Sequence, residues 1–235
     1  MAAPLQAAAL AAAPAASAPL WLVFVTGLVA AAIAAGAWAL THTAVTIAHE
    51  GGHAFTASAV GGRVTDINIF RRGGGLTNSV IPAHDGKAFL VGIAGYIGPS
   101  LFGLAGAMLL STGRVKAALW LTLVLVACAL WLAKGWYSVA SMSVLGGLIF
   151  LVIRYAGHGA QTFFTYTWVW FLLLGGIRGV LVLAEIRATG KDAQSDAYQL
   201  GQLTSLPATI FVGFFTVVSF AALVAGGLIM AGALA

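Results

Sequence analysis

Charged residues are scarce in this sequence. Only 7% of its 235 residues are Asp, Glu, Lys or Arg, whereas a soluble domain carries about 25%. So few charges cannot cover a water-exposed surface, which excludes an ordinary soluble enzyme, a nucleic-acid-binding module and a disordered tail. Hydrophobic residues make up 61% of the chain, and the mean hydropathy is +1.01. Long uncharged apolar stretches therefore predict an all-α polytopic membrane protein.

Cysteine and N-terminal charge are also lacking. Cys128 is the only cysteine, so no intramolecular disulfide can form. Residues 1–18 contain no charge, whereas a secretory signal begins with a basic region. We therefore expect 1–18 to be a disordered Ala/Pro leader and 19–235 to form a single membrane-embedded domain. A cleavable signal that ends near residues 35–37 is the alternative.

The apolar stretches predict about six transmembrane helices. The first lies within residues 20–60, which contain no proline. As one straight helix this segment would be about 60 Å long, twice the thickness of the bilayer core. It must therefore tilt, break near Gly36 or extend beyond the membrane. The other crossings are expected at about 87–111, 115–133, 137–153, 160–187 and 205–232.

A strand-like segment follows the first helix. Apolar and polar residues alternate over 64–69, and Arg71 and Arg72 lead into three consecutive glycines, Gly73–Gly75. Alternation of period two is typical of a half-buried strand, and glycine permits the backbone conformations of tight turns. The segment therefore predicts a short glycine-rich β-hairpin.

The sequence His49-Glu50-Gly51-Gly52-His53 is a His-Glu-x-x-His motif. On a helix, residues four apart lie on one face, so both imidazoles can bind one Zn²⁺. Glu50 would then lie beside the metal and act as the general base. Random order of this composition would produce about 0.003 such motifs. Histidine and glutamate are also costly within a membrane, which favours a functional site over a polar helix end.

Two histidines leave a tetrahedral zinc short of one protein ligand. His42 lies on the same helical face as His49 but about 10 Å away along the axis, too far to share the metal. The connection 188–204 is the better source, because it lies on the side of the membrane where the motif helix ends. Asp196 and Asp192 compete as ligands there. The remaining candidates are Asp66, His84, Asp85 and His158.

The segments His49–Ala54, Gly61–Val64 and Gly73–Gly75 together resemble the site-2 protease family of intramembrane zinc metalloproteases, in particular its small bacterial branch without a PDZ domain. The resemblance implies that a glycine-rich β-segment engages the substrate, which assigns Gly73, Gly74 and Gly75 to substrate binding. It also implies that a late aspartate, here Asp196, is the third zinc ligand. Better-known members carry this aspartate between leucine and glycine, whereas here serine and alanine flank it.

We accordingly expect a zinc-dependent endopeptidase that cleaves a peptide bond in or near a transmembrane segment of a membrane-protein substrate. Its partners would be that substrate and the lipid bilayer, with no nucleic acid. The alternative is a non-proteolytic membrane scaffold or partner subunit that retains the zinc site. A structural site would need a fourth protein ligand, and none is evident. An ion transporter would need paired polar residues in several helices, and only Arg178 and Glu185 suggest a pair.

Basic residues predict the orientation of the chain. With six crossings, the first, third and fifth connections share one side of the membrane. That side carries seven basic residues and the other side three, so the positive-inside rule places it in the cytoplasm. Both termini would then be outside a multi-pass protein of the cell membrane, with the active site toward the cytoplasm. The seven are Arg63, Arg71, Arg72, Lys87, Lys134, Arg187 and Lys191, and the three are Arg114, Lys116 and Arg154.

Overall fold

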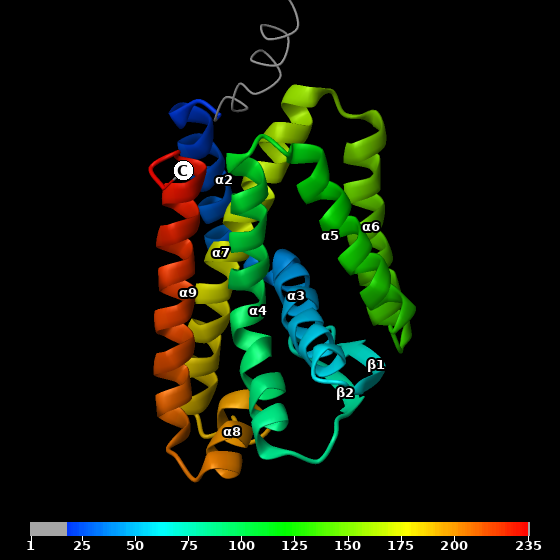
Figure 1. Ribbon diagram of the computed structural model, residues 1–235, viewed down its shortest axis with the longest axis vertical. Helices are drawn as coiled ribbons and strands as arrows, with labels where there is room; N and C mark the ends of the chain where they lie inside the picture. The colour runs from blue at the N-terminus through cyan, green and yellow to red at the C-terminus, as the bar shows by residue number, and fades with distance from the viewer. Residues whose placement is uncertain (1–17, 235) are drawn as a thin grey trace, which may run out of the picture.

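A computed structural model describes residues 18–234 as a helical fold with one small sheet (Figure 1). The predicted leader, apart from Ala18, lies outside the described residues. The elements are α2 (Leu20–Gly36), α3 (Trp38–Ala59), β1 (Arg63–Ile69), β2 (Gly75–Val80), α4 (Asp85–Ser111), α5 (Val115–Trp131), α6 (Trp136–Tyr155), α7 (His158–Ala188), α8 (Asp196–Thr204) and α9 (Ala208–Met230).

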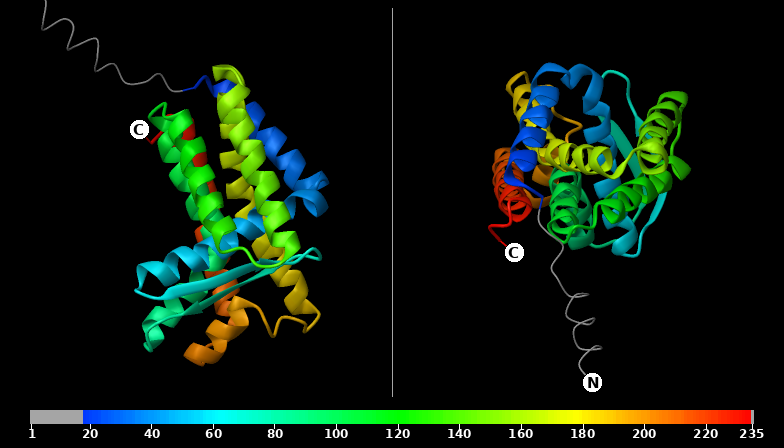
Figure 2. Two further views of the ribbon diagram at one scale, coloured as in Figure 1. Left: turned by 90° about the vertical axis from the view of Figure 1, so that its right-hand side faces the viewer. Right: turned by 90° about the horizontal axis from the view of Figure 1, so that it is seen from above.

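The segment 20–60, which was expected to hold the first crossing, is broken near Gly36. Such a break was one of the three alternatives that its length left open. Helix α2 ends at Gly36, α3 begins at Trp38, and the two axes are bent by 106°. Figure 2 shows the consequence, because α3 runs across the molecule whereas α2, α4 and α7 run along its length. The His-Glu-x-x-His motif is therefore carried on a helix that lies crosswise at the foot of α2.

The predicted polytopic all-α architecture is confirmed, with fewer candidate spans than the expected six. Helices α4, α6, α7 and α9 are long and apolar enough to cross a membrane, and the bent pair of α2 and α3 would make a fifth span. Helix α5 is apolar but has only 17 residues, a length of about 25 Å, which is shorter than the bilayer core. Residues 18–234 thus form a multi-pass membrane protein with four or five candidate spans.

The predicted β-hairpin is also confirmed. Strands β1 and β2 pair antiparallel, with Ile67 opposite Thr77 and an irregularity between Val64 and Asp66. Gly73 and Gly74 in the connecting turn have φ values of 101° and 77°, a backbone region that residues other than glycine adopt only at a cost in free energy. These two glycines therefore allow the chain to reverse between the strands.

The hairpin is fastened to the connection between α5 and α6. The Ile67 amide donates to the Leu132 carbonyl and the Lys134 amide donates to the Ile67 carbonyl, each at 2.8 Å. The Ile69 amide donates to Ser138 Oγ, also at 2.8 Å. Strand β1 thus lies between β2 and this connection. The hairpin, the α5–α6 connection and α8 all lie at one end of the molecule (Figure 1), as expected for three connections on one side of a membrane.

Helices α3 and α4 approach so closely that only glycine fits between them. A Cβ atom on Gly52 of α3 would lie 2.4 Å from the main-chain carbonyl oxygen of Ala94 and 3.3 Å from Gly98 Cα, both on α4. Such backbone contact is typical of membrane helices with small residues at the interface. It fixes the motif helix α3 against α4, which lies against the His49 and His53 side chains.

Candidate metal centre

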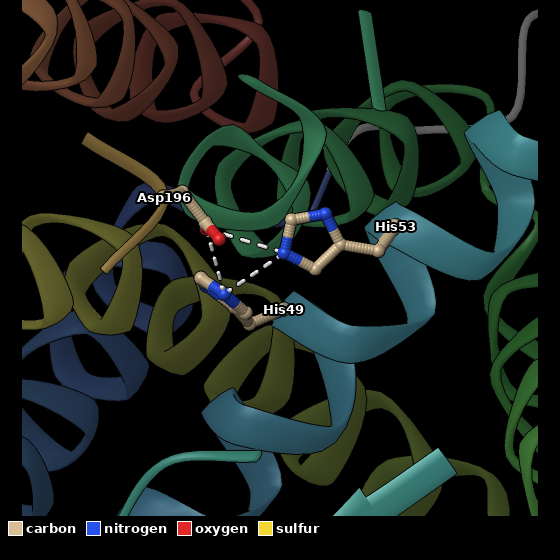
Figure 3. A group of neighbouring side chains, drawn as sticks. All are labelled: His49, His53 and Asp196. Carbon is tan, nitrogen blue, oxygen red and sulfur yellow. Dashed lines mark hydrogen bonds and ion pairs between the residues drawn. The ribbon is translucent and has the colours of Figure 1, made fainter. Parts of the chain in front are cut away.

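Three side chains from distant parts of the chain converge at one point (Figure 3). His49 Nε2 and His53 Nε2 each lie 3.2 Å from Asp196 Oδ2, and the two nitrogens lie 3.3 Å from each other. The histidines come from α3 and the carboxylate from the first residue of α8. All three predicted metal ligands are thus brought together by the fold.

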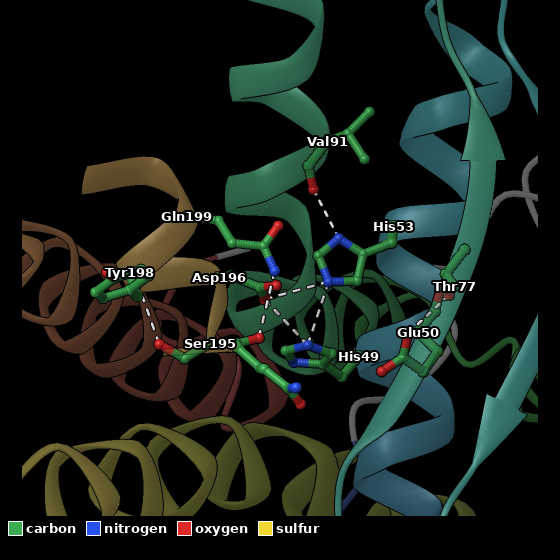
Figure 4. Close-up of polar contacts among 10 residues, drawn as sticks. His49, Glu50, His53, Thr77, Val91, Ser195, Asp196, Tyr198 and Gln199 are labelled. Carbon is green, nitrogen blue, oxygen red and sulfur yellow. Dashed lines mark hydrogen bonds and ion pairs between the residues drawn. The ribbon is translucent and has the colours of Figure 1, made fainter. Parts of the chain in front are cut away.

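The orientation of His53 is fixed from outside this cluster. Its Nδ1 atom lies 2.7 Å from the main-chain carbonyl oxygen of Val91 on α4 (Figure 4). A carbonyl only accepts, so Nδ1 must carry the hydrogen. Nε2 then presents a lone pair toward His49 and Asp196. A hydrogen bond of this kind is how metal-binding histidines are generally oriented.

Asp196 reaches the site because α8 begins at that residue. Ser195 precedes it as the N-cap, and its Oγ accepts a hydrogen bond from the Tyr198 amide at 3.2 Å. Serine at this position satisfies an amide that the helix leaves unpaired. Asp192, the competing candidate, forms an ion pair with Arg187 instead. Within residues 18–234, no other histidine, cysteine or acidic residue joins the cluster.

The charge of Asp196 depends on the two imidazoles. Burial by itself raises the pKa of the carboxyl, but the positive charge that a proton places on the facing imidazoles of His53 and His49 outweighs it and holds the pKa well below its ordinary range. The side chain is therefore an anion, the form that binds a cation. Its buried Oδ2 atom nevertheless has no hydrogen-bond donor within residues 18–234, so it is free to serve as a ligand atom.

Gly95 on α4 gives the histidines their space. A Cβ atom there would lie 2.6 Å from His49 Nε2 and 2.6 Å from His53 Cε1, closer than real contacts allow. Beside it, the Tyr96 ring meets the His49 ring edge-on, with the centroids 4.7 Å apart. The sequence alone assigned neither residue to the site. The spacing of Gly92, Gly95 and Gly98 could have indicated a glycine face on α4, but it does not reveal that imidazoles lie against that face.

Glu50, the predicted general base, is buried between α3 and β2. Its side chain is 2% exposed, and its Oε2 atom accepts a hydrogen bond of 2.7 Å from the Thr77 hydroxyl (Figure 4). A Cβ atom on Gly75 would lie 2.5 Å from Glu50 Oε1 and 2.7 Å from its Cγ. The glycine thus lets the strand approach the carboxylate. Thr77 was missed, because nothing in the sequence pairs it with a residue on another element.

A family model described as Peptidase M50B-like matches residues 20–226. The chain belongs to this family. The match confirms the resemblance to the site-2 protease family that the sequence motifs carry, and it indicates a membrane metallopeptidase. No curated protein and no solved structure matches the chain.

The three ligand atoms of this M50B-like protein fit zinc, the metal of M50 peptidases. Zinc bonds of about 2.0–2.1 Å to nitrogen and oxygen place the corners of a tetrahedron about 3.3 Å apart. The observed separations of 3.2, 3.2 and 3.3 Å among His49 Nε2, His53 Nε2 and Asp196 Oδ2 match that spacing. A zinc ion held by these three side chains would keep its fourth position open, as catalytic zinc sites do.

The glycines that were assigned to substrate binding lie in different surroundings. Gly75 begins β2 and contacts Glu50, whereas Gly73 and Gly74 belong to the turn. A Cβ atom on Gly73 would lie 4.0 Å from His42 Nε2, and one on Gly74 would meet no atom within 4 Å. Of the three, Gly75 is therefore the nearest to the motif. A role for them in binding substrate stays a prediction.

The suggested pair of Arg178 and Glu185 is wrong. The Arg178 guanidinium lies 5.9 Å from the centre of the Trp38 ring, Glu185 is exposed, and no ion pair joins them in the described chain. The aromatic ring thus takes the place of the carboxylate as the neighbour of this membrane-embedded cation. The one pair that suggested an ion pathway is therefore absent from residues 18–234.

Proposed function

We propose that this M50B-like protein is a zinc-dependent intramembrane endopeptidase that hydrolyses a peptide bond in or near a transmembrane segment of a membrane-protein substrate. The observation that carries the proposal is the triangle of His49 Nε2, His53 Nε2 and Asp196 Oδ2, with sides of 3.2–3.3 Å. Glu50, a group able to transfer protons, directly follows the first ligand in the chain.

Each residue has a role in this reaction. His49, His53 and Asp196 would hold Zn²⁺, which supplies Lewis acidity toward the scissile carbonyl and acidifies water. Glu50 accepts a proton from the attacking water and returns it to the leaving amine. Because the Glu50 side chain is 2% exposed, bulk water competes little for this proton. The hydrogen bond that His53 Nδ1 donates to the Val91 carbonyl would hold the orientation of that imidazole.

The substrate segment would have to be extended near the scissile bond, because a helix uses its carbonyl groups in its own hydrogen bonds. The hairpin offers one edge for such a segment. The outer edge of β1 is occupied by Leu132 and Lys134, whereas β2 pairs with no second strand within residues 18–234. Addition of a substrate strand to β2 would use main-chain hydrogen bonds and would bring the segment beside Glu50.

The cell membrane and a cytoplasmic orientation of the site belong to the proposal as well. The connections that carry the seven basic residues include the hairpin and the loop before α8, which lie at one end of the molecule (Figure 1). The positive-inside rule then orients this end toward the cytoplasm. A non-proteolytic scaffold is the less favoured function, since within residues 18–234 no fourth protein ligand closes the metal cluster.

The decisive experiment uses purified full-length protein in lipid vesicles. It is incubated with β-casein, an unfolded polypeptide, and with a panel of tagged single-span membrane proteins. We expect cleavage by the wild type, loss of cleavage in Glu50→Gln or with a zinc chelator, and about one zinc per chain in both proteins. Full activity of Glu50→Gln would remove the assigned base. Absence of zinc from the wild type after resupply would favour the scaffold.

A further inference from the structure

The general base of the proposed reaction is held by a residue of the hairpin. Thr77 Oγ1 lies 2.7 Å from Glu50 Oε2 and 3.1 Å from the Glu50 main-chain oxygen. Among the described residues, no other side chain donates a hydrogen bond to this carboxylate. A glutamate side chain has three rotatable bonds, so this one contact has a large share in its orientation.

Strand β2 also restricts the position of the Glu50 carboxylate on a second side, through Gly75. Gly75 and Thr77 are two residues apart, and side chains two apart on a strand point to the same face. That face is half-buried against α3, whereas the intervening Leu76 is exposed. A Cβ on Gly75 would lie 2.5 Å from Glu50 Oε1. Strand β2 thus provides both the hydrogen-bond donor of the Glu50 carboxylate, Thr77, and a closely packed stretch of backbone at Gly75.

Thr77 itself is placed by the anchored part of the sheet. It is the β2 partner of Ile67, whose amide and carbonyl groups bond Leu132 and Lys134 on the α5–α6 connection. The Ile67 side chain is fully buried. A continuous set of contacts therefore runs from the α5–α6 connection through Ile67 and Thr77 to Glu50.

We propose that Thr77 is a positioning residue whose hydroxyl orients the Glu50 carboxylate. The orientation of this base therefore depends on the position of the hairpin. The proposal rests on the proposed endopeptidase function. A base is effective only when it is within hydrogen-bond reach of the proton that it accepts, and small misplacements of reacting groups lower rates strongly. Loss of the hydroxyl should therefore lower the rate of the chemical step and leave metal binding intact.

The test compares Thr77→Val, which removes the hydroxyl and keeps the shape, with Thr77→Ser, which keeps the hydroxyl. Thr65→Val is the matched control, because Thr65 lies on β1 and its hydroxyl bonds the Asn78 carbonyl at 3.0 Å. Kinetics are measured on a substrate that the wild type cleaves. We expect kcat of Thr77→Val to fall about 10–100-fold, the range for a hydrogen bond to a charged group, with KM and zinc content unchanged. Thr77→Ser should recover most of the rate.

Several outcomes would overturn the proposal. These are an unchanged or raised kcat in Thr77→Val, a loss of zinc, a change confined to KM, or a serine variant as slow as the valine variant. If Thr77→Val and Thr77→Ala both fail to fold, the hydroxyl is structural and the proposal is also overturned. Failure of the Thr77 proposal can be told apart from failure of the proposed function. If only the role of Thr77 is wrong, Glu50→Gln is still inactive. If the proposed function is wrong, Glu50→Gln retains activity.

Discussion

His53 Nε2 lies 3.2 Å from Asp196 Oδ2, and each of these side chains is aimed by a contact outside the metal centre. His53 donates to the Val91 carbonyl at 2.7 Å. Asp196 is held at the start of α8, which Ser195 caps through the Tyr198 amide. Outer contacts of this kind orient metal ligands before the metal arrives. The centre is therefore preorganised by α4 and α8 as well as by the motif helix.

Removal of a ligand should abolish stoichiometric zinc binding. We expect His49→Ala and Asp196→Ala to lose the approximately one zinc per chain of the wild type, because two ligands hold zinc weakly. Asp192→Ala is the matched control, since Asp192 pairs with Arg187 and should leave the zinc in place. Metal analysis of detergent-purified protein provides the measurement. Zinc that persists in Asp196→Ala would move the third ligand elsewhere, with Asp192 the next candidate.

A single methyl group at Gly95 should disturb the same centre. A Cβ there would lie 2.6 Å from His49 Nε2, and forcing extra atoms into a packed site costs about 1–3 kcal/mol. We therefore expect Gly95→Ala to weaken zinc binding by tenfold or more, the factor that corresponds to about 1.4 kcal/mol. Competition with a zinc-sensitive dye measures the affinity. Gly213→Ala is the control, because a Cβ on Gly213 meets no atom within 4 Å. Equal affinities in the two variants would contradict the close contact.

Glycine at position 75 should matter for the base and not for the metal. An alanine methyl group would lie 2.5 Å from Glu50 Oε1 and displace either the carboxylate or strand β2. We expect kcat of Gly75→Ala to fall at least tenfold, given the sensitivity of rates to misplaced groups, while zinc content stays at the wild-type value. Leu76→Ala, on the exposed face of the same strand, serves as control. A Gly75→Ala enzyme with wild-type kcat would show that the carboxylate has room to move.

Local patterns predicted a large part of this molecule. The His-Glu-x-x-His spacing places His49 and His53 on one helical face whatever surrounds the helix, and alternation with glycines predicted the hairpin. The choice of Asp196 over Asp192 came from a family resemblance, since spacing alone left both open. The structure distinguishes them through a distant partner, because Arg187 pairs with Asp192 and leaves Asp196 to the histidines.

The features that escaped prediction depend on where elements meet. Hydropathy reports how apolar a segment is and not its direction, so the 106° bend at Gly36 was one of several alternatives. It also counted the 17-residue helix α5 as a full crossing. Thr77 and Gly95 act on residues of a different element, and one sequence without its fold does not say which strand or helix will face Glu50 or the histidines.

The hairpin should become sensitive to acid through Asp66. The Asn78 amide donates to this carboxylate at 2.8 Å. Asn68 donates at 2.7 Å, and Lys134 Nζ lies 3.7 Å away. These contacts, that of Asn78 foremost, hold the pKa of Asp66 below its usual 3.8. A lowered folded-state pKa means that the carboxylate stabilises the hairpin above pH 3.8 and that this stabilisation is lost as pH falls through the folded-state pKa.

Asp66→Asn should accordingly increase amide hydrogen exchange over residues 63–80 at pH 6, and the difference from the wild type should shrink near pH 2. Comparison of both proteins at the same pH removes the pH dependence of intrinsic exchange. Glu185→Gln is the control, because Glu185 is an exposed residue of α7, an element separate from the hairpin. A difference between Asp66→Asn and the wild type that is equally large at both pH values would assign the effect to side-chain shape. A difference that vanishes in acid assigns it to the charge that joins β1, β2 and Lys134.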